Sequence, residues 1–391
     1  MTMRNAFLAV SLLVSSAMFL KPTLLCAAES DPVIFTFATV GDSRQDPEAE
    51  GISGADKRWH QNTPALARIL REIQTQRPYA LFFNGDMIYG YSTNRPDLDR
   101  EYAYWRGMVA GLIEAGTYVV PVPGNHEVQL KVKGADGVVR KTACAPSEEA
   151  WRANMGDLIL DTALWRRLRG AEVAAWDVQH TPAIGGADQI TSDQRQLTFA
   201  FDDHDLHFVV INTDATGQDS HAPVAWLAKD LELAKQRGVR RSFVFGHKMA
   251  YTYHYGDKVE PKGLDAHPDN QRAFWDLMER YGATYFCGHE HVYHSSQPRS
   301  NAGGHAWQII SGSGGSPFEA KPGQSTNPKD RYYAWAFVRV HQSGRVQLTA
   351  HGFDERFGPT ELIEKLELAP GTTTAASQIS SPFRNAVVTG P

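Results

Sequence analysis

Five short apolar runs recur along the chain, and each one ends in a small polar motif. The runs are rich in β-branched and aromatic residues and occupy 32–40, 79–84, 117–123, 241–245 and 283–287. Uninterrupted apolar runs of this length are typical of strands that are buried on both faces. The motifs that follow them are, in chain order, Gly41-Asp42, Gly85-Asp86, Gly124-Asn125-His126-Glu127, Gly246-His247 and Gly288-His289-Glu290-His291.

Helical patterns lie between the predicted strands. Apolar residues recur at i, i+3, i+4 and i+7 in 64–76 and in 269–281, and an apolar stripe in 223–237 ends at Gly238. Strands that alternate with helices predict an α/β architecture. In such sheets the loops beyond the carboxyl ends of the strands gather in one crevice, so we expect the polar motifs to meet there.

Residues 128–196 interrupt this alternation, and we interpret them as a partly helical insertion. Two positions are open for it. It lies over the face that carries the polar motifs, because long functional insertions concentrate on loops, or it is a peripheral packing element. After it, strands are predicted at 197–201 and 206–211, and a hairpin over 332–354 turns at Ser343-Gly344.

The two ends of the chain differ from its middle. Arg4, the apolar stretch 6–20 and small residues before Glu29 predict a cleaved signal peptide over 1–28, and hence a secreted or periplasmic protein. The stretch is short for a membrane span, so no span is expected after cleavage; an uncleaved anchor, or a lipoprotein signal at Cys26, is the alternative. Residues 370–391 are rich in Thr, Ser and Ala and predict a disordered tail, which leaves 29–369 as one folded domain.

Composition and charge change this picture little. The 391 residues are 42% hydrophobic and 21% charged, which is ordinary for a globular protein. The formal net charge of -5 gives no indication of a nucleic-acid-binding surface. After signal cleavage only Cys144 and Cys287 remain, which is not a disulfide framework, and we expect no bridge between them.

The polar motifs supply oxygen and imidazole donors without a thiolate. Such donors suit zinc, iron or manganese. They are too many for one ion and divide naturally between two ions that share a bridging carboxylate; two such ions can hold a hydroxide nucleophile and clamp the oxygens of a phosphoryl group. Each motif alone is more consistent with a solvated turn, but their joint occurrence favours a metal site. The candidate ligands are Asp42, Asp86, Asn125, His247, His289 and His291.

In this order the motifs resemble the calcineurin-like metallophosphoesterase superfamily, whose pattern is an early Asp motif followed by GD, GNH[D/E], GH and GHxH. The resemblance covers about 33–350. Within the superfamily the chain is most similar to the purple acid phosphatase branch, because Asp86 and Tyr89 match its GDxxY motif and 222–231 resembles its WLxxDL helix. The resemblance implies a single catalytic domain with a four-layer fold, in which two mixed β-sheets are flanked by helices and the metal site lies at the C-terminal ends of the strands.

The resemblance also implies how the ligands divide. The first metal, often ferric iron in that branch, would be held by Asp42, Tyr89 and His291. The second, a divalent zinc, manganese or iron ion, would be held by Asn125, His247 and His289. Asp86 would bridge the two. Tyr89 has an alternative role as a packing or substrate-facing aromatic, since other superfamily members bind two metals with a different residue at that place.

Three further residues are expected to face the substrate or its surroundings. His126 would stabilise charge or protonate the leaving oxygen. His254 lies in a loop where family members place substrate-facing histidines, at a somewhat different spacing. Arg44 departs from the family pattern. Because a guanidinium stays protonated and cannot ligate a metal, Arg44 either grips a phosphate or pairs with a carboxylate. The branch often carries an immunoglobulin-like domain before the catalytic one, and none fits before Val33.

The expected function is hydrolysis of a phosphomonoester, carried on a small molecule or an exposed phosphate ester. The alternative within enzymes is a phosphodiesterase or nucleotide-cleaving enzyme that uses the same site. A non-catalytic binding protein on this fold is a further alternative, but it predicts lost ligands, and all six core positions are present. A secreted structural or adhesion protein would require no pair of metal ions.

Overall fold

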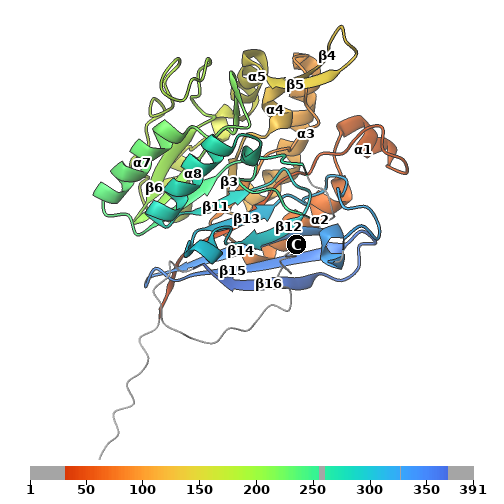
Figure 1. The fold of residues 1–391 in the computed structure, drawn as a ribbon. Helices are drawn as coiled ribbons and strands as arrows, with labels where there is room; N and C mark the ends of the chain where they lie inside the picture. The colour runs from red at the N-terminus through yellow and green to blue at the C-terminus, as the bar shows by residue number, and fades with distance from the viewer. Residues whose placement is uncertain (1–30, 255–259, 326, 369–391) are drawn as a thin grey trace, which may run out of the picture.

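Two six-stranded mixed β-sheets organise the fold (Figure 1). The protein is described here by a computed structural model, which covers residues 31–254, 260–325 and 327–368. The predicted signal peptide at 1–28 and the predicted tail at 370–391 lie outside the described residues.

The first sheet has the order β16-β15-β14-β1-β2-β3. Its strands β1, β2 and β3 are parallel, while β14 runs antiparallel to β1 and is followed by two further antiparallel strands. The strands are β1 (Val33–Val40), β2 (Ala80–Phe83), β3 (Tyr118–Pro121), β14 (Tyr332–His341), β15 (Val346–Asp354) and β16 (Glu361–Glu367).

The second sheet has the order β12-β13-β11-β10-β7-β6. Its four inner strands are parallel, and the two edge strands are antiparallel to their neighbours. The strands are β6 (Phe199–Asp203), β7 (Leu206–Val210), β10 (Arg241–Phe245), β11 (Thr284–Cys287), β12 (Tyr293–Ser296) and β13 (Trp307–Ser311).

The inner faces of the two sheets share an aromatic core. Phe37 of β1 contacts Phe208, Phe243, Phe245 and Phe286 of the second sheet, with ring centroids 5.3 to 6.4 Å apart. All of these rings are at most 1% exposed. Since burying one such side chain contributes about 1.5–3 kcal/mol, this layer fixes how the sheets face each other.

Helices cover the two outer faces and complete four layers. On the first sheet, α2 (Thr63–Gln76) and α3 (Arg95–Glu114) bury apolar stripes in the same core as the strands. On the second, α7 (Val224–Gln236) and α8 (Pro268–Tyr281) lie side by side and bury theirs against the outer strand residues. The structure therefore confirms the predicted α/β, four-layer sandwich of two mixed sheets flanked by helices.

The remaining helices are α1 (Gly54–Trp59), α4 (Asn125–Val128), α5 (Ala145–Met155) and α6 (Thr162–Arg169). Short 3₁₀ helices cover Gly156–Leu158, Leu264–Ala266, Ser300–Ala302 and Pro328–Arg331. None of the helices in the described ranges combines the length and hydropathy that a membrane span requires.

The segment 128–196 contains a β-hairpin followed by α5 and α6 (Figure 1). The hairpin pairs β4 (Gln129–Lys133) with β5 (Val139–Ala143). A second small ribbon pairs β8 (Asp214–Ala215) with β9 (Gln218–Asp219). The two ribbons are joined by hydrogen bonds from Gln129 Nε2 to Asp214 Oδ1 (3.0 Å) and Asp219 Oδ1 (2.9 Å).

Candidate metal centre

The candidate ligands lie where the central parallel strands of both sheets end. β1, β2 and β3 lead into Asp42, Asp86 and Asn125, and β10 and β11 lead into His247 and His289. Asn84 ties the two sheets together at this point, because its side chain donates to the Cys287 carbonyl (3.3 Å) and its own carbonyl accepts from His247 Nδ1 (2.7 Å). The five side chains, although far apart in the sequence, thus converge where the ends of the two sheets meet.

Two groups of potential ligand atoms form there, and they share one carboxylate. Asp86 groups with His247 and His289, and it also groups with Asp42 and His291; the atoms of each group lie within 4.8 Å of one another. A carboxylate common to two adjacent donor sets is what a bridging ligand requires. The donors are imidazole and carboxylate, which suits zinc, iron or manganese.

The surroundings of His247 Nε2 indicate a cation. Three atoms crowd it: Asn125 Oδ1 at 2.9 Å, Asp86 Oδ1 at 3.1 Å and His289 Nδ1 at 3.1 Å. With Nδ1–H donated to the Asn84 carbonyl, Nε2 faces these three atoms, so either a proton on Nε2 or a metal ion has to lie between them. Only positive charge satisfies such a convergence. Although desolvation opposes it, the Asp86 and Asp42 carboxylates raise the pKa of His247 to about 10.

Asp42 and His291 form the other end of the cluster. Burial raises the pKa of Asp42 well above its usual range, so a cation beside it would restore its charge. His291 directs Nε2 toward Asp42 Oδ1 at 3.7 Å, because its Nδ1 donates to the Pro317 carbonyl (2.6 Å). Both side chains are buried, and together with Asp86 they fit a second ion.

Three of the ligands sit in left-handed turns. Asp42, Asp86 and His289 have φ of 59°, 52° and 70°, a region that non-glycine residues rarely adopt. The glycines beside them permit the close approach of the loops. A Cβ on Gly288 would lie 2.2 Å from Asp42 Oδ2, and one on Gly124 would lie 2.5 Å from Asp86 Oδ1. Gly124 and Gly288 are therefore required because a larger residue at either position would clash with a candidate ligand across the site.

Glu127 holds the loop that carries Asp86. Its buried carboxylate accepts the backbone N–H groups of Asp86 (2.9 Å), Met87 (2.9 Å), Ile88 (3.2 Å) and Gly124 (2.7 Å). The last residue of the GNHE motif thus fixes the bridging aspartate without belonging to either donor group.

His126 lies beside the cluster and faces the cavity. Its Nδ1–H donates to the Tyr89 carbonyl, and its Nε2 lies 3.6 Å from Asp86 Oδ2. Burial lowers the pKa of His126 well below its usual value, and Arg44 lowers it further. The ring is therefore neutral, with Nε2 directed toward Asp86 and the cavity.

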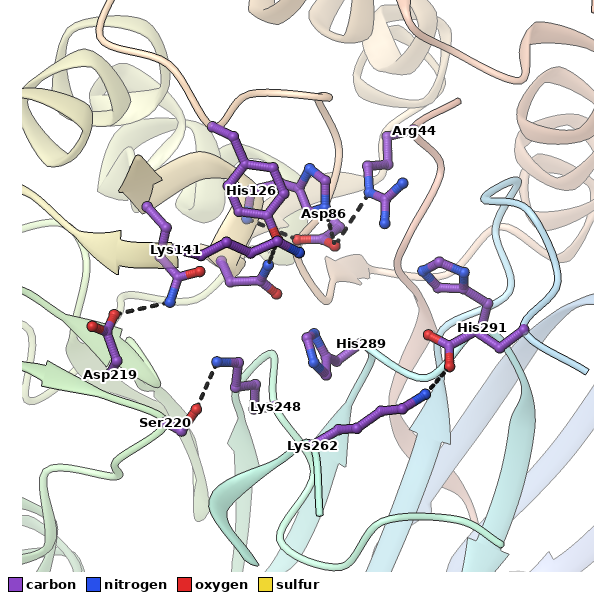
Figure 2. A pocket seen from close by; sticks show the side chains of 14 residues that line it. Arg44, Asp86, His126, Lys141, Asp219, Ser220, Lys248, Lys262, His289 and His291 are labelled. Carbon is purple, nitrogen blue, oxygen red and sulfur yellow. Dashed lines mark hydrogen bonds and ion pairs between the residues drawn. The ribbon is translucent and has the colours of Figure 1, made fainter. Parts of the chain in front are cut away.

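A cavity of about 420 Å³ opens over the cluster. Figure 2 shows cationic side chains around it, contributed by separate segments. It is lined by Arg44, Asp86, Tyr91, Asn125, His126, Gln129, Lys141, Asp219, Ser220, Lys248, Lys262, His289, His291 and Glu319. Since Gln129 and Lys141 belong to the β4–β5 hairpin, the first part of the 128–196 segment lies over the metal face.

Tyr89 does not line this cavity, and Tyr91 takes its place. The backbone N–H of Tyr89 is held by Glu101 Oε2 (2.9 Å), and its ring packs near His60, with centroids 5.2 Å apart. The Tyr91 hydroxyl instead accepts a hydrogen bond from Asn125 Nδ2. The GDxxY spacing predicted the first tyrosine of GDMIYGY, whereas the structure brings the second one to a ligand.

The two predicted substrate-binding residues differ in position. Arg44 lines the cavity, with Nε 3.5 Å from Asp86 Oδ2, so it is placed both to pair with that carboxylate and to meet a phosphate. His254 is exposed and is not among the lining residues. The structure therefore does not bring His254 to the site.

Sequence reasoning missed the lysines of the cavity. Lys248 directly follows His247, and its amine contacts Asp214 Oδ1 (2.6 Å) and Ser220 Oγ (2.7 Å). Lys262 pairs with Glu319. Lys248 could have been found from the sequence because it directly follows the candidate ligand His247, whereas Lys141 and Lys262 lie in segments without any motif.

Comparison with known proteins agrees with this geometry. The sequence profile of the calcineurin-like phosphoesterase family matches residues 59–293. No curated protein matches the chain by sequence. A purple acid phosphatase from yellow lupin (Lupinus luteus) seeds is 13% identical, with a TM-score of 0.52 over 90% of this chain and 58% of that chain; at this identity the likeness shows the fold alone.

Two further solved structures are similar at lower scores. A dimetal phosphatase from Danio rerio is 14% identical, with a TM-score of 0.44 over 87% of this chain and 100% of that chain. A PhoD structure is 12% identical, with a TM-score of 0.48 over 86% of this chain and 72% of that chain.

Proposed function

The chain belongs to the calcineurin-like phosphoesterase family, and from this premise we propose that it is a two-metal phosphatase that hydrolyses phosphomonoesters. Family membership makes it a phosphoester hydrolase. The observation that carries the finer proposal is that Asp86 is shared by two donor groups at the floor of a cation-lined cavity. We propose ferric iron with zinc, manganese or ferrous iron as the metal pair.

Each residue of the site has a distinct part in this reaction. The two cations would supply Lewis-acid chemistry, which polarises the phosphoryl group and neutralises the charge that develops on it. Arg44, which lines the cavity beside Asp86, would hold phosphate oxygens there. The neutral His126 ring carries its proton on Nδ1, which donates to the Tyr89 carbonyl and keeps Nε2 directed at the cavity. The negative charge of a bound phosphate would favour the imidazolium form, and from that form Nε2 would deliver its proton to the leaving oxygen.

The monoester is favoured over the diester by charge. Arg44, Lys141, Lys248 and Lys262 all line the cavity, and a monoester dianion carries one negative charge more than a diester. Comparison of 4-nitrophenyl phosphate with bis(4-nitrophenyl) phosphate across pH, together with elemental analysis of the purified protein, tests this directly. Faster turnover of the diester would assign the site to a phosphodiesterase.

Ligand variants test the site itself. Asn125→Ala and His289→Ala are each expected to abolish turnover and to reduce the bound metal, with the circular dichroism spectrum retained. His204→Ala is the matched control, because His204 is exposed and pairs with Asp203, away from the donor groups. Wild-type activity with unchanged metal content in either ligand variant would refute the assignment.

Export is part of the same proposal. The signal predicted over 1–28 is expected to be removed, and N-terminal sequencing of the protein recovered outside the cytoplasm should then begin at Glu29.

A further inference from the structure

Lys141 differs from the other cations of the cavity in its pairing. Lys248 pairs with Asp214, and Lys262 pairs with Glu319. The Lys141 amine lies 4.4 Å above the centre of the Tyr91 ring, and no carboxylate of the described residues lies within ion-pair distance of it. A positive charge on the cavity wall is thus left without an anionic partner.

The hairpin that carries Lys141 is fixed rather than loosely attached. Asp219, which also lines the cavity, accepts hydrogen bonds from the Thr142 hydroxyl (2.8 Å), the Ala143 N–H (2.8 Å) and the Gln129 side chain (2.9 Å). The Lys131 N–H donates to the Tyr91 carbonyl (3.3 Å) at the other strand. Lys141 is therefore presented to the cavity by an ordered element.

The register of the hairpin extends this positive charge outward. Lys131 is directly opposite Lys141, and opposite residues in an antiparallel pair share a face. Gln129 and Lys133 lie on that face by alternation, and Gln129 lines the cavity. Like charges directly opposite each other destabilise a hairpin, and an anion bound between them would remove that repulsion.

The field around Lys141 is consistent with such an anion. Desolvation lowers the pKa of the Lys141 amine, and Arg44, Lys131 and Lys248 lower it further, against the opposing effect of Asp86. The positive groups of the cavity rim therefore act on one another through space, and an anion beside Lys141 would offset this repulsion.

We propose that Lys141, on the β4–β5 hairpin, binds a second phosphate group of the substrate, so that the enzyme prefers substrates that carry another phosphate besides the one that is cleaved. This inference rests on the proposed phosphatase function and names its substrate class. The second phosphate has two possible sources, a separate ester on the same small molecule or the next unit of a phosphoanhydride chain.

Two substrate pairs distinguish these sources. Fructose 1,6-bisphosphate is compared with fructose 6-phosphate for a separate ester, and ADP with AMP for an anhydride chain. In each pair kcat/KM of the doubly phosphorylated compound is divided by that of the singly phosphorylated one. A charge-assisted hydrogen bond corresponds to about tenfold, so Lys141→Met is expected to lower this ratio about tenfold in at least one pair.

Arg140→Met is the matched control. Arg140 precedes Lys141 on β5, points to the other face of the hairpin and pairs with Asp136 (2.6 Å). The Arg140→Met substitution therefore removes the same charge from a side chain that does not face the cavity. Its ratios should equal those of the wild type. Unchanged ratios in Lys141→Met, or an equal fall in Arg140→Met, would overturn the inference.

A binding measurement separates this inference from the proposed function. Calorimetry of the metal-loaded protein with methylenebisphosphonate and with inorganic phosphate, with metal content checked afterwards, needs no turnover. If the protein hydrolyses no ester but Lys141→Met selectively weakens the binding of methylenebisphosphonate, the anion site is supported and the phosphatase function is refuted. Turnover with no Lys141-dependent preference in either assay would refute the anion site alone.

Discussion

Tyr91 joins the candidate metal ligands to the wall of the cavity. Its hydroxyl accepts a hydrogen bond from Asn125, its ring lies 3.8 Å from that of His126, and the Lys141 amine lies over its face. Burial raises the pKa of Tyr91 far above its usual value, so in the metal-free protein it remains a neutral phenol. Tyr91 therefore contacts the candidate ligand Asn125, the His126 ring and the Lys141 amine at once.

Paired phenylalanine variants separate the two tyrosines of GDMIYGY. Tyr91→Phe removes the partner of Asn125 and is expected to lower kcat/KM about tenfold or more, since an unsatisfied buried amide loses about 1–3 kcal/mol. Tyr89→Phe, which removes no hydrogen bond to a ligand, is expected to have a smaller effect. Steady-state kinetics measures both.

Spectroscopy of the iron-loaded protein tests whether Tyr89 is nevertheless a metal ligand. If Tyr89 is a ligand of ferric iron, a visible charge-transfer band should be present in the wild type and lost in Tyr89→Phe but retained in Tyr91→Phe. That pattern would confirm the prediction that Tyr89 is a ligand.

At the scale of elements, a buried histidine attaches α7 to the edge of the second sheet. His207 of β7 contacts Asp202 (2.6 Å) and Asp230 of α7 (2.8 Å). His180 also pairs with Asp230 (2.9 Å), and Arg237 pairs with Asp202 (2.6 Å). Desolvation acts against the charged form of His207, but its bonds to both carboxylates outweigh it and raise its pKa. The pKa values of Asp202 and Asp230 are lowered, against desolvation, by the same partners.

This cluster gives stability a defined dependence on pH. The raised pKa of His207 stabilises the folded state fully below the ordinary histidine value of about 6.5 and loses this effect as pH rises through the raised value. The lowered pKa values of the Asp202 and Asp230 carboxyl groups stabilise the folded state above about pH 4, and this stabilisation is lost as pH falls further. His207→Gln is expected to cost about 3–5 kcal/mol near pH 5.5 and less at pH 9, measured by urea unfolding of the metal-free protein.

The control for this prediction is His204→Gln. His204 pairs with the neighbouring Asp203 but is exposed, so its loss should change stability little at either pH. An equal loss in His207→Gln at both pH values would show that packing, and not charge, is what His207 contributes.

The sequence was sufficient to predict the elements that hold ligands. The five apolar runs became β1, β2, β3, β10 and β11, and the three helical patterns became α2, α7 and α8. These were predictable because burial on both faces leaves a local pattern. The predicted strands 197–201 and 206–211 and the hairpin at Ser343-Gly344 are also confirmed, with shifts of one or two residues.

The features that the sequence could not predict depend on pairing between strands that are far apart in the chain, or on the local backbone conformation. No local pattern shows that β14 lies beside β1, some 300 residues earlier in the chain. Tyr91, which lies beside Asn125, sits in a left-handed turn with φ of 52°, and no spacing rule contains such a turn. The lysines were missed because charged residues on loops and hairpins are also ordinary solvated side chains.

At the scale of the molecule, the candidate ligands are divided between the two sheets. Asp42, Asp86 and Asn125 follow strands of the first sheet, and His247 and His289 follow strands of the second. Bound ions would therefore join the two halves across the edge where their loops meet, in addition to the aromatic core that joins their faces.

Removal of metal is expected to loosen both halves together. Ions present at 100 times their dissociation constant stabilise the folded state by about 2.7 kcal/mol, so chelation should lower the unfolding midpoint. Hydrogen exchange should quicken in the loops after β1, β2 and β3 and in those after β10 and β11. A change confined to one sheet would show that the ions do not bridge them.

The position of β1 has a consequence for synthesis of the protein. β1 is the first described strand, yet it lies inside its sheet, between β2 and a strand that begins at Tyr332. Until that late segment leaves the ribosome, one edge of the nascent β1 has no partner, and an open apolar edge invites association with other chains. A truncated translation product that stops before β14 would carry this exposed edge permanently.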